Sequence, residues 1–254
     1  MAASARHGVD LLLDIGNSRV KWRAGELQDL AGFPAPAGDI ATTCESLWGA
    51  LPVGRVALAN VRTDALAERL CSWVAARWGL QAVRIRAQAQ AAGVRCGYAE
   101  PERLGADRWA AIVAAHRRAG GAALAVCCGT ATTIDWVDHR GHHRGGLILP
   151  GQALMYEAFF RRTGLPAAPA AVSDFGPGLG DSTRTAVARG AHVATLGAIE
   201  RVCRQHRADC PRAPLYLCGG AAPAVLAGLD VDAELAPDLV LQGVADLLEW
   251  QCEH

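Results

Sequence analysis

The sequence lacks the features that mark several classes of protein. It has 254 residues and no net charge at neutral pH, because 25 basic side chains balance 25 acidic ones. No block of basic residues supplies the electrostatic footprint that a nucleic acid or an anionic membrane surface requires. Its uncharged stretches are short and contain glycine and threonine, as in residues 119–134, which argues against a membrane-spanning helix. We therefore expect no nucleic-acid partner and no membrane partner.

Paired cysteine motifs are also missing. The nine cysteines are scattered along the chain and none stands in a CxxC spacing, so no zinc site is indicated. Their odd number and mostly apolar neighbours are typical of small hydrophobic residues in a reducing compartment. The first residues, MAASARHG, lack the apolar core of a signal peptide. These features predict a cytoplasmic protein.

The stretch LLLDIGNSRVKW, residues 11–22, is typical of a β-hairpin whose turn binds phosphate. Its apolar run stops at Asp14, and Gly16 and Asn17 allow a tight turn whose backbone N–H groups point into one small volume. Asp14 is placed to hold a magnesium ion through water, and Lys21 can reach the terminal phosphates. The alternative interpretation is an ordinary hairpin with a solvated lysine.

A second copy of this pattern favours the phosphate-binding interpretation. When Gly129 is aligned with Gly16, the stretch LAVCCGTATTIDW (residues 124–136) repeats the order of apolar strand, glycine turn and strand. Such a duplication predicts two related lobes, residues 1–118 and 119–254, facing each other across a cleft. Thr130 would then offer its hydroxyl and N–H group to a phosphate from the opposite side. Where the first copy has Asp14, the second has Cys127.

The rest of the chain alternates strand and helix patterns, which indicates an α/β fold. We expect strands at 56–61 and 82–86, a helix between them capped by Thr63, and loops at 32–38 and 164–172. A helix should begin at Ala106, with Asp107 in its first turn. Asp107 either complements the helix dipole or accepts a proton from a substrate hydroxyl, and Arg108 is either a surface charge or binds the substrate's anionic or amide end.

The second half carries further candidate elements. Three histidines in the stretch HRGHHRGG, residues 139–146, are expected to be solvated on a hairpin tip rather than to bind a metal. Ser182 is a good N-cap for a long helix, which places Thr183 where a hydroxyl and free N–H groups can grip a polar ligand or merely cap the helix. A C-terminal helix over 238–249 should complete the second lobe.

Together these motifs resemble those of the type III pantothenate kinases, a family related to sugar kinases, actin and Hsp70-type ATPases. DIGNSRVK resembles the family's first phosphate motif, YAEPERLGADR its pantothenate and catalytic motif, GTATTID its second phosphate motif, GGLILPG and GDST its substrate-proximal loops, and CGGA its adenosine motif. The match covers nearly the whole chain. It implies two duplicated ribonuclease H-like lobes of the actin-like ATPase type, with a nucleotide cleft between them.

The resemblance also implies an activity: transfer of the γ-phosphoryl group of ATP to the 4′-hydroxyl of pantothenate, the first committed step toward coenzyme A. Asp107 would be the general base, and Asp14 would hold magnesium through water. The implied ATP-binding residues are Asp14, Ile15, Gly16, Asn17, Ser18, Arg19, Val20, Lys21 and Thr130. The implied pantothenate-binding residues are Tyr98, Gly105, Ala106, Asp107, Arg108 and Thr183. The family also implies a homodimer.

One position departs from the family pattern. Many members have Asp two residues before the glycine of the second phosphate motif, where it binds a monovalent cation such as potassium or ammonium, and here that residue is Cys127. A neutral thiol is a poor ligand for a hard cation, so we expect little potassium dependence. Asp135 or backbone carbonyls remain as substitute ligands.

Two other functions fit parts of the pattern. One is a kinase of the same fold that acts on a sugar or a carboxylate, although the YxxPxxLGxDR arrangement, residues 98–108, argues against it. The other is a regulatory accessory factor of transcription. The presence of Asp14, Lys21, Asp107 and Thr183 argues against a chain with no activity.

Overall fold

The structure is a computed structural model that describes residues 8–25, 31–35, 39–61, 64–166 and 174–254. It contains two five-stranded mixed sheets with the same topology. The first sheet has the order β3-β2-β1-β4-β5, and the second has the order β10-β9-β8-β11-β12. In each sheet an antiparallel three-stranded meander is extended by two parallel strands. The duplication predicted from the two glycine turns is therefore present in the fold.

The strand bounds show how closely the two halves match. The first sheet consists of β1 (Val9–Ile15), β2 (Arg19–Ala24), β3 (Ala31–Pro34), β4 (Val53–Asn60) and β5 (Val83–Ile85). The second consists of β8 (Ala123–Cys128), β9 (Ala131–Val137), β10 (His143–Pro150), β11 (Leu215–Cys218) and β12 (Glu234–Leu235). The expected loop at 32–38 is wrong in its first part, because residues 32–34 belong to edge strand β3. Two short strands, β6 (Gln90–Ala91) and β7 (Val94–Arg95), form a separate hairpin.

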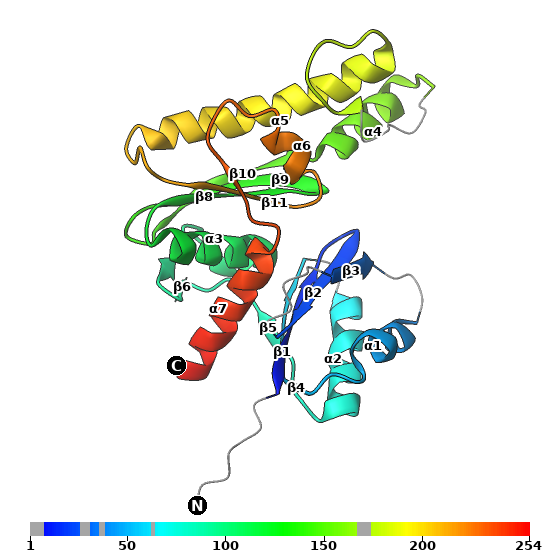
Figure 1. Ribbon diagram of the computed structural model, residues 1–254, viewed down its shortest axis with the longest axis vertical. Helices are drawn as coiled ribbons and strands as arrows, with labels where there is room; N and C mark the ends of the chain where they lie inside the picture. Colours follow the sequence, from blue (N-terminus) through cyan, green and yellow to red (C-terminus); the bar gives the residue numbers. More distant parts are fainter. Residues whose placement is uncertain (1–7, 26–30, 36–38, 62–63, 167–173) are drawn as a thin grey trace, which may run out of the picture.

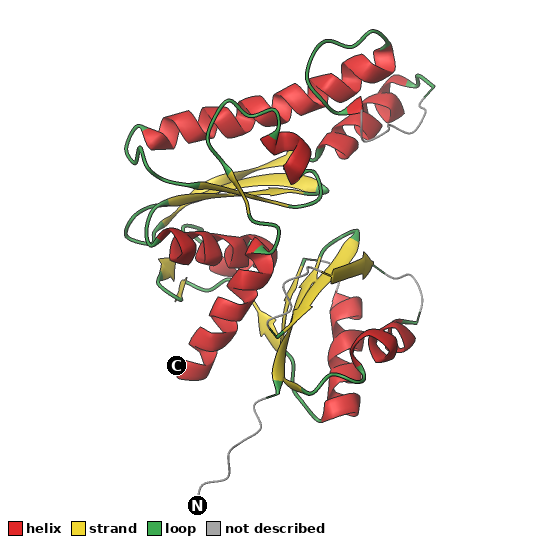
Figure 2. Ribbon diagram, viewed as in Figure 1, coloured by secondary structure: helices red, strands yellow, loops and turns green. Residues whose placement is uncertain are grey.

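Helices cover both faces of each sheet, and two of them lie between the sheets (Figures 1 and 2). The outer face of the first sheet packs against α1 (Ile40–Trp48) and α2 (Asp64–Trp78). The outer face of the second packs against α5 (Thr183–Arg207) and α6 (Ala222–Leu226), and α4 (Gln152–Thr163) lies against α5. The helices between the sheets, α3 (Ala106–Ala119) and α7 (Leu239–Glu253), share one apolar core with their inner faces.

The packing of α7 corrects one expectation. The C-terminal helix does not simply complete the second lobe, because it packs against α3 and against β1, β4 and β5 of the first sheet. The two helices approach closely at Gly243, where a Cβ atom would collide with the carbonyl of Ala110. Since α3 and α7 touch elements of both sheets, the proposed division into residues 1–118 and 119–254 stays a prediction.

Local predictions about the helices hold where the structure describes them. Helix α3 begins at Ala106, and α5 begins after Ser182, whose hydroxyl accepts the N–H of Thr185 in a reciprocal capping box. The expected cap at Thr63 and most of the connector at 164–172 lie outside the described residues. Among the described residues, no helix has both the length and the apolar character needed to cross a membrane.

Candidate functional site

The two duplicated glycine turns face each other across a cleft. The Oγ of Ser18 in the first turn lies 3.1 Å from the Oγ1 of Thr130 in the second, within hydrogen-bond distance. The two turns and the residues near them line a cavity of about 300 Å³. It is lined by residues from both halves: Asp14, Gly16, Asn17, Ser18, Arg19, Lys21, Val61, Asp107, Cys127, Gly129, Thr130, Ala131, Thr133, Cys218, Gly219, Gly220 and Val240.

Asp14 and Lys21 stand side by side and both line this cleft. They are register partners in the β1–β2 hairpin, so their side chains emerge on the same face of the sheet. Burial raises the pKa of Asp14 to about 6, against the lowering effect of Lys21 and with a further rise from Asp107. A buried carboxylate of this kind, facing a polar cavity, fits the oxygen-ligand chemistry of magnesium, because a bound cation would compensate the cost of its charge.

Asp107 enters the same cavity from the first turn of α3. Its Oδ1 accepts the N–H of Arg108 at 2.7 Å, which fixes the carboxylate against the start of the helix. The preceding N-cap residue is Gly105, where a Cβ atom would lie 2.8 Å from Oδ1, so glycine leaves room for this orientation. Burial raises the pKa of Asp107 above its ordinary value, although the N–H and charge of Arg108 oppose the rise. Asp107 therefore has the accessibility and the basicity that a proton acceptor needs.

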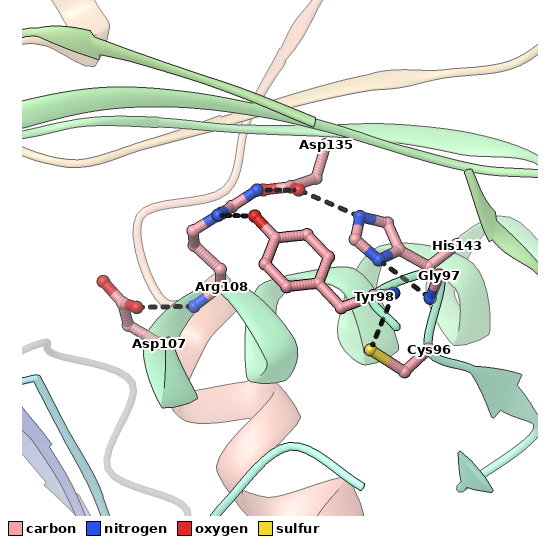
Figure 3. Close-up of polar contacts among 7 residues, drawn as sticks. All are labelled: Cys96, Gly97, Tyr98, Asp107, Arg108, Asp135 and His143. Carbon is pink, nitrogen blue, oxygen red and sulfur yellow. Dashed lines mark hydrogen bonds and ion pairs between the residues drawn. The ribbon is translucent and has the colours of Figure 1, made fainter. Parts of the chain in front are cut away.

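The Arg108 side chain turns into a buried polar network (Figure 3). Its Nε and Nη2 donate to the two carboxylate oxygens of Asp135 at 3.0 and 2.6 Å, and its Nη1 donates to the Tyr98 hydroxyl at 2.8 Å. Arg108 and Asp135 are 5% and 2% exposed. A bidentate pair at this depth holds the guanidinium in one orientation. The surface-charge interpretation of Arg108 is therefore wrong.

His143 completes this network, and the expectation that the histidine cluster is solvated is wrong for this member. His143 is buried, and its Nε2 lies 3.0 Å from Oδ1 of Asp135. The N–H of Gly97 points at Nδ1 from 3.5 Å and can only donate, so the hydrogen-bond pattern assigns the proton to Nε2. The Tyr98 ring stacks on His143 with centroids 6.0 Å apart.

A bulge in β10 explains how His143 reaches its position. The pairing of β9 with β10 shifts register between His143 and Gly146, with Gly145 at a φ of +99°. Such a bulge re-aims a side chain near the end of a sheet. At Gly146 a Cβ atom would collide with the Asp135 carboxylate, so only glycine fits there. The bulge at Gly145 and the lack of space at Gly146 explain the two glycines that begin the stretch GGLILPG.

The structure brings together some of the predicted residues and separates others. Those that line the cleft are Asp14, Gly16, Asn17, Ser18, Arg19, Lys21, Asp107 and Thr130. Ile15 and Val20 are buried core residues beside the turn. Gly105, Ala106 and Arg108 flank Asp107 in the chain, Tyr98 contacts Arg108, and none of these four residues lines the cavity. Thr183 is exposed at the start of α5 and lies outside the cleft of its own chain.

Sequence reasoning missed His143 and gave Asp135 a different role. Asp135 stands in an apolar strand, ATTIDWV, and a charged residue there signals a buried partner. Nothing local indicates that the partners are Arg108 and His143. Both oxygens of Asp135 accept hydrogen bonds from these donors, and its part in a monovalent cation site stays a prediction.

Comparisons with known proteins agree with this architecture. Residues 10–205 match the family model described as type III pantothenate kinase. A type III pantothenate kinase from Burkholderia mallei is 38% identical over 251 residues, covering 92% of this chain and 97% of the relative. One from Nitrosococcus oceani is 34% identical over 246 residues, covering 92% of each chain.

Solved structures resemble the chain in fold. A Campylobacter jejuni protein assigned to the Baf family of transcriptional activators has a TM-score of 0.58 at 20% identity, with 96% of this chain and 100% of that chain covered. The acetate kinase of Porphyromonas gingivalis has a TM-score of 0.51 at 11% identity, with 96% and 100% covered. At such identities the likeness concerns the actin-like ATPase fold alone. The family match and the sequence relatives go further: the chain belongs to the type III pantothenate kinase family.

Proposed function

We propose that this protein transfers the γ-phosphoryl group of ATP to the 4′-hydroxyl of pantothenate, with Asp107 as the general base. The observation that carries the proposal is the meeting of both glycine turns, Lys21 and Asp107 in one cleft. Phosphoryl transfer needs mainly positioning and charge neutralisation, and these groups supply both. The cleft is the ATP site in this proposal.

The phosphates would lie between the turns. The first turn would bind them from one side and the Thr130 hydroxyl from the other, with Lys21 supplying positive charge. Asp14 would hold magnesium through water, and when bound the ion would neutralise phosphate charge. Asp107 would accept the proton of the attacking hydroxyl.

Pantothenate would bind beside Asp107, at Tyr98, Gly105, Ala106 and Arg108. The Arg108–Asp135–His143 network supports this, because it fixes the guanidinium of the residue that follows the base, together with the Tyr98 phenol hydrogen-bonded to it. Arg108 is suited to the anionic or amide end of the substrate.

Thr183 would take part from the partner subunit of a homodimer, since its own chain does not bring it to the cleft. Exposed apolar side chains on the second half favour such an assembly: Leu147 and Ile148 on edge strand β10, Leu154 and Phe159 on α4, and Val193 on α5. Light scattering should report a dimer. Ile148→Glu should split it, whereas the matched change at an exposed leucine of β12, Leu235→Glu, should not. A fully active monomer at assay concentration would contradict the homodimer.

The activity itself is tested by ADP release. With ATP, magnesium and pantothenate the protein should release ADP and form 4′-phosphopantothenate, and omission of pantothenate should abolish turnover. A panel of sugars and small carboxylates is the control. Turnover with one of them but not with pantothenate would assign another kinase activity, and no turnover with any acceptor would favour a regulatory role. As a cytoplasmic enzyme it would meet both substrates, in line with its nine unpaired cysteines.

A further inference from the structure

Two cysteines meet in the floor of the cleft. Cys127 and Cys218 are register partners at the ends of the parallel strands β8 and β11, so their side chains emerge on the same face. Their Sγ atoms are 2.9 Å apart, and both are free thiols. Cys128, although next in sequence, packs into the apolar core on the opposite face of the sheet. The pair is therefore isolated from the third cysteine nearby.

The geometry of the two strands suits a covalent link. Neighbouring strands are about 4.8 Å apart, which lies within the range of about 4.4 to 6.8 Å that separates the Cα atoms of disulfide-bonded cysteines. The sulfurs already point at each other, so closure needs only a small approach without a change of register. No backbone element has to move out of the sheet.

Access to the pair runs through the cleft. Both cysteines line the same cavity as Gly129, Thr130, Gly219 and Gly220. Cys218 is only 2% exposed, and Cys127 is partly exposed. A small reagent that enters the cleft meets Cys127 first, and a nucleotide in the cleft would stand in its way.

We propose that Cys127 and Cys218 form a modification site, a dithiol that closes to an internal disulfide by exchange with a small, uncharged disulfide compound. The Cys127 sulfur attacks one sulfur of the reagent, whose S–S bond breaks, and the released half leaves as a thiol carrying the proton that Cys127 loses. The Cys218 sulfur then attacks Cys127 in the mixed disulfide, and the second half leaves with the proton of Cys218. Two protein thiols are oxidised and the reagent is reduced to two thiols.

The surroundings of the pair favour the protonated thiol of Cys127. The contact with Cys218, burial, and the charges of Asp107 and Asp135 together hold the pKa of Cys127 well above its usual range. Exchange proceeds through the thiolate, so closure is slow at neutral pH and needs the reagent in excess.

The test uses the full chain and 2-hydroxyethyl disulfide. After incubation the protein is denatured, its free thiols are alkylated, and its peptides are analysed without reduction. We expect a cross-linked peptide that joins Cys127 to Cys218, with the loss of two hydrogen atoms, and its disappearance after treatment with dithiothreitol. Finding both thiols alkylated, while the exposed Cys252 carries the reagent, would overturn the proposal.

Two variants sharpen the result. Cys218→Ser should leave Cys127 as a stable mixed disulfide with the reagent, because the second step lacks its nucleophile. Cys252→Ser should close like the wild type. A wild-type protein that stops at the mixed disulfide on Cys127 would also contradict the proposal, since it would show that Cys218 does not attack.

Protection of the cysteine pair by a bound nucleotide rests on the proposed function, whereas formation of the disulfide does not. Saturating ADP should slow cross-linking by at least about tenfold, because only the unoccupied cleft admits the reagent. If the disulfide forms equally fast with ADP, the dithiol site stands and the placement of nucleotide in this cleft is wrong. If no disulfide forms in either condition, the dithiol proposal fails and the kinase proposal is untouched.

Discussion

The Ser18 and Thr130 hydroxyls lie 3.1 Å apart although 112 residues separate them in the chain. Each belongs to one of the two duplicated turns, so this contact joins the two halves of the molecule. Phosphate oxygens between the turns would replace the contact with hydrogen bonds of their own. In the proposed function the two turns would act together as one phosphate-binding site.

Thr130→Val keeps the shape of the side chain and removes its hydroxyl. If this hydroxyl binds a phosphate, the KM for ATP should rise by roughly tenfold or more, as expected for a lost hydrogen bond to a charged group. The KM for pantothenate should be unchanged, and Thr130→Ser should behave like the wild type. Initial rates at varied ATP decide this, and an unchanged KM for ATP in Thr130→Val would remove Thr130 from the ATP site.

Lys21 is the only lysine of the chain, which allows a direct test of its place in the cleft. An amine-reactive reagent should modify Lys21 in the free protein, and saturating ATP should protect it, while the N-terminal amine is labelled equally in both samples. Lys21→Ala should raise the KM for ATP by at least about tenfold, because a charged partner of the phosphates is lost. Labelling that ignores ATP would place Lys21 outside the site.

His143 is predicted to position Arg108 and Tyr98 without touching substrate. Gln at this position can still donate to Asp135, whereas Asn is too short to reach it, so His143→Asn should raise the KM for pantothenate by roughly tenfold and His143→Gln by less. The KM for ATP should not change in either variant. Equal effects on both substrates, or a loss of thermal stability that parallels the loss of activity, would show a purely structural role.

Asp135 itself is a poorer target for such an experiment. Removing one partner of a buried ion pair costs about 3 to 5 kcal/mol and leaves the other charge unpaired. In an Asp135 variant, loss of folding would obscure any effect on pantothenate. His143 is the better target, because its replacement leaves the ion pair between Arg108 and Asp135 in place.

Sequence patterns predicted the parts of the fold that are set locally. The hairpins at 11–22 and 124–136 follow from apolar strands ending at glycine turns, and the start of α5 follows from the capping residue Ser182. The burial of His143, the bulge at Gly145 and the packing of α7 on the first sheet depend on contacts between distant segments. For the same reason, the pattern that placed Asp107 in a first helical turn could not reveal the partners of Arg108.

Potassium should stimulate this enzyme weakly or not at all. Cys127 stands in place of the carboxylate, its thiol stays protonated near neutral pH, and Asp135 is engaged by Arg108 and His143. Activity should be titrated with potassium and with sodium at equal ionic strength. Strong saturating activation by potassium alone would show that other groups build a cation site. Cys127→Asp should create or strengthen a potassium response.

The central claim is that Asp107 removes the proton from the acceptor hydroxyl. A base acts only when deprotonated, and burial raises the pKa of Asp107, so kcat/KM should fall as the pH drops through a value above the ordinary range near 4. Saturating magnesium should be used in this titration, because a cation bound beside Asp14 keeps that carboxylate ionised. The fall of kcat/KM at acidic pH then reports the protonation of Asp107.

The most direct measurement compares turnover in the wild type and Asp107→Asn at saturating ATP and pantothenate, together with ATP binding by calorimetry. The substitution keeps the size of the side chain and removes the proton acceptor. We expect kcat to fall by about 10² to 10⁴-fold while ATP binds as in the wild type. Turnover in Asp107→Asn equal to that of the wild type would contradict the assignment of Asp107 as the general base.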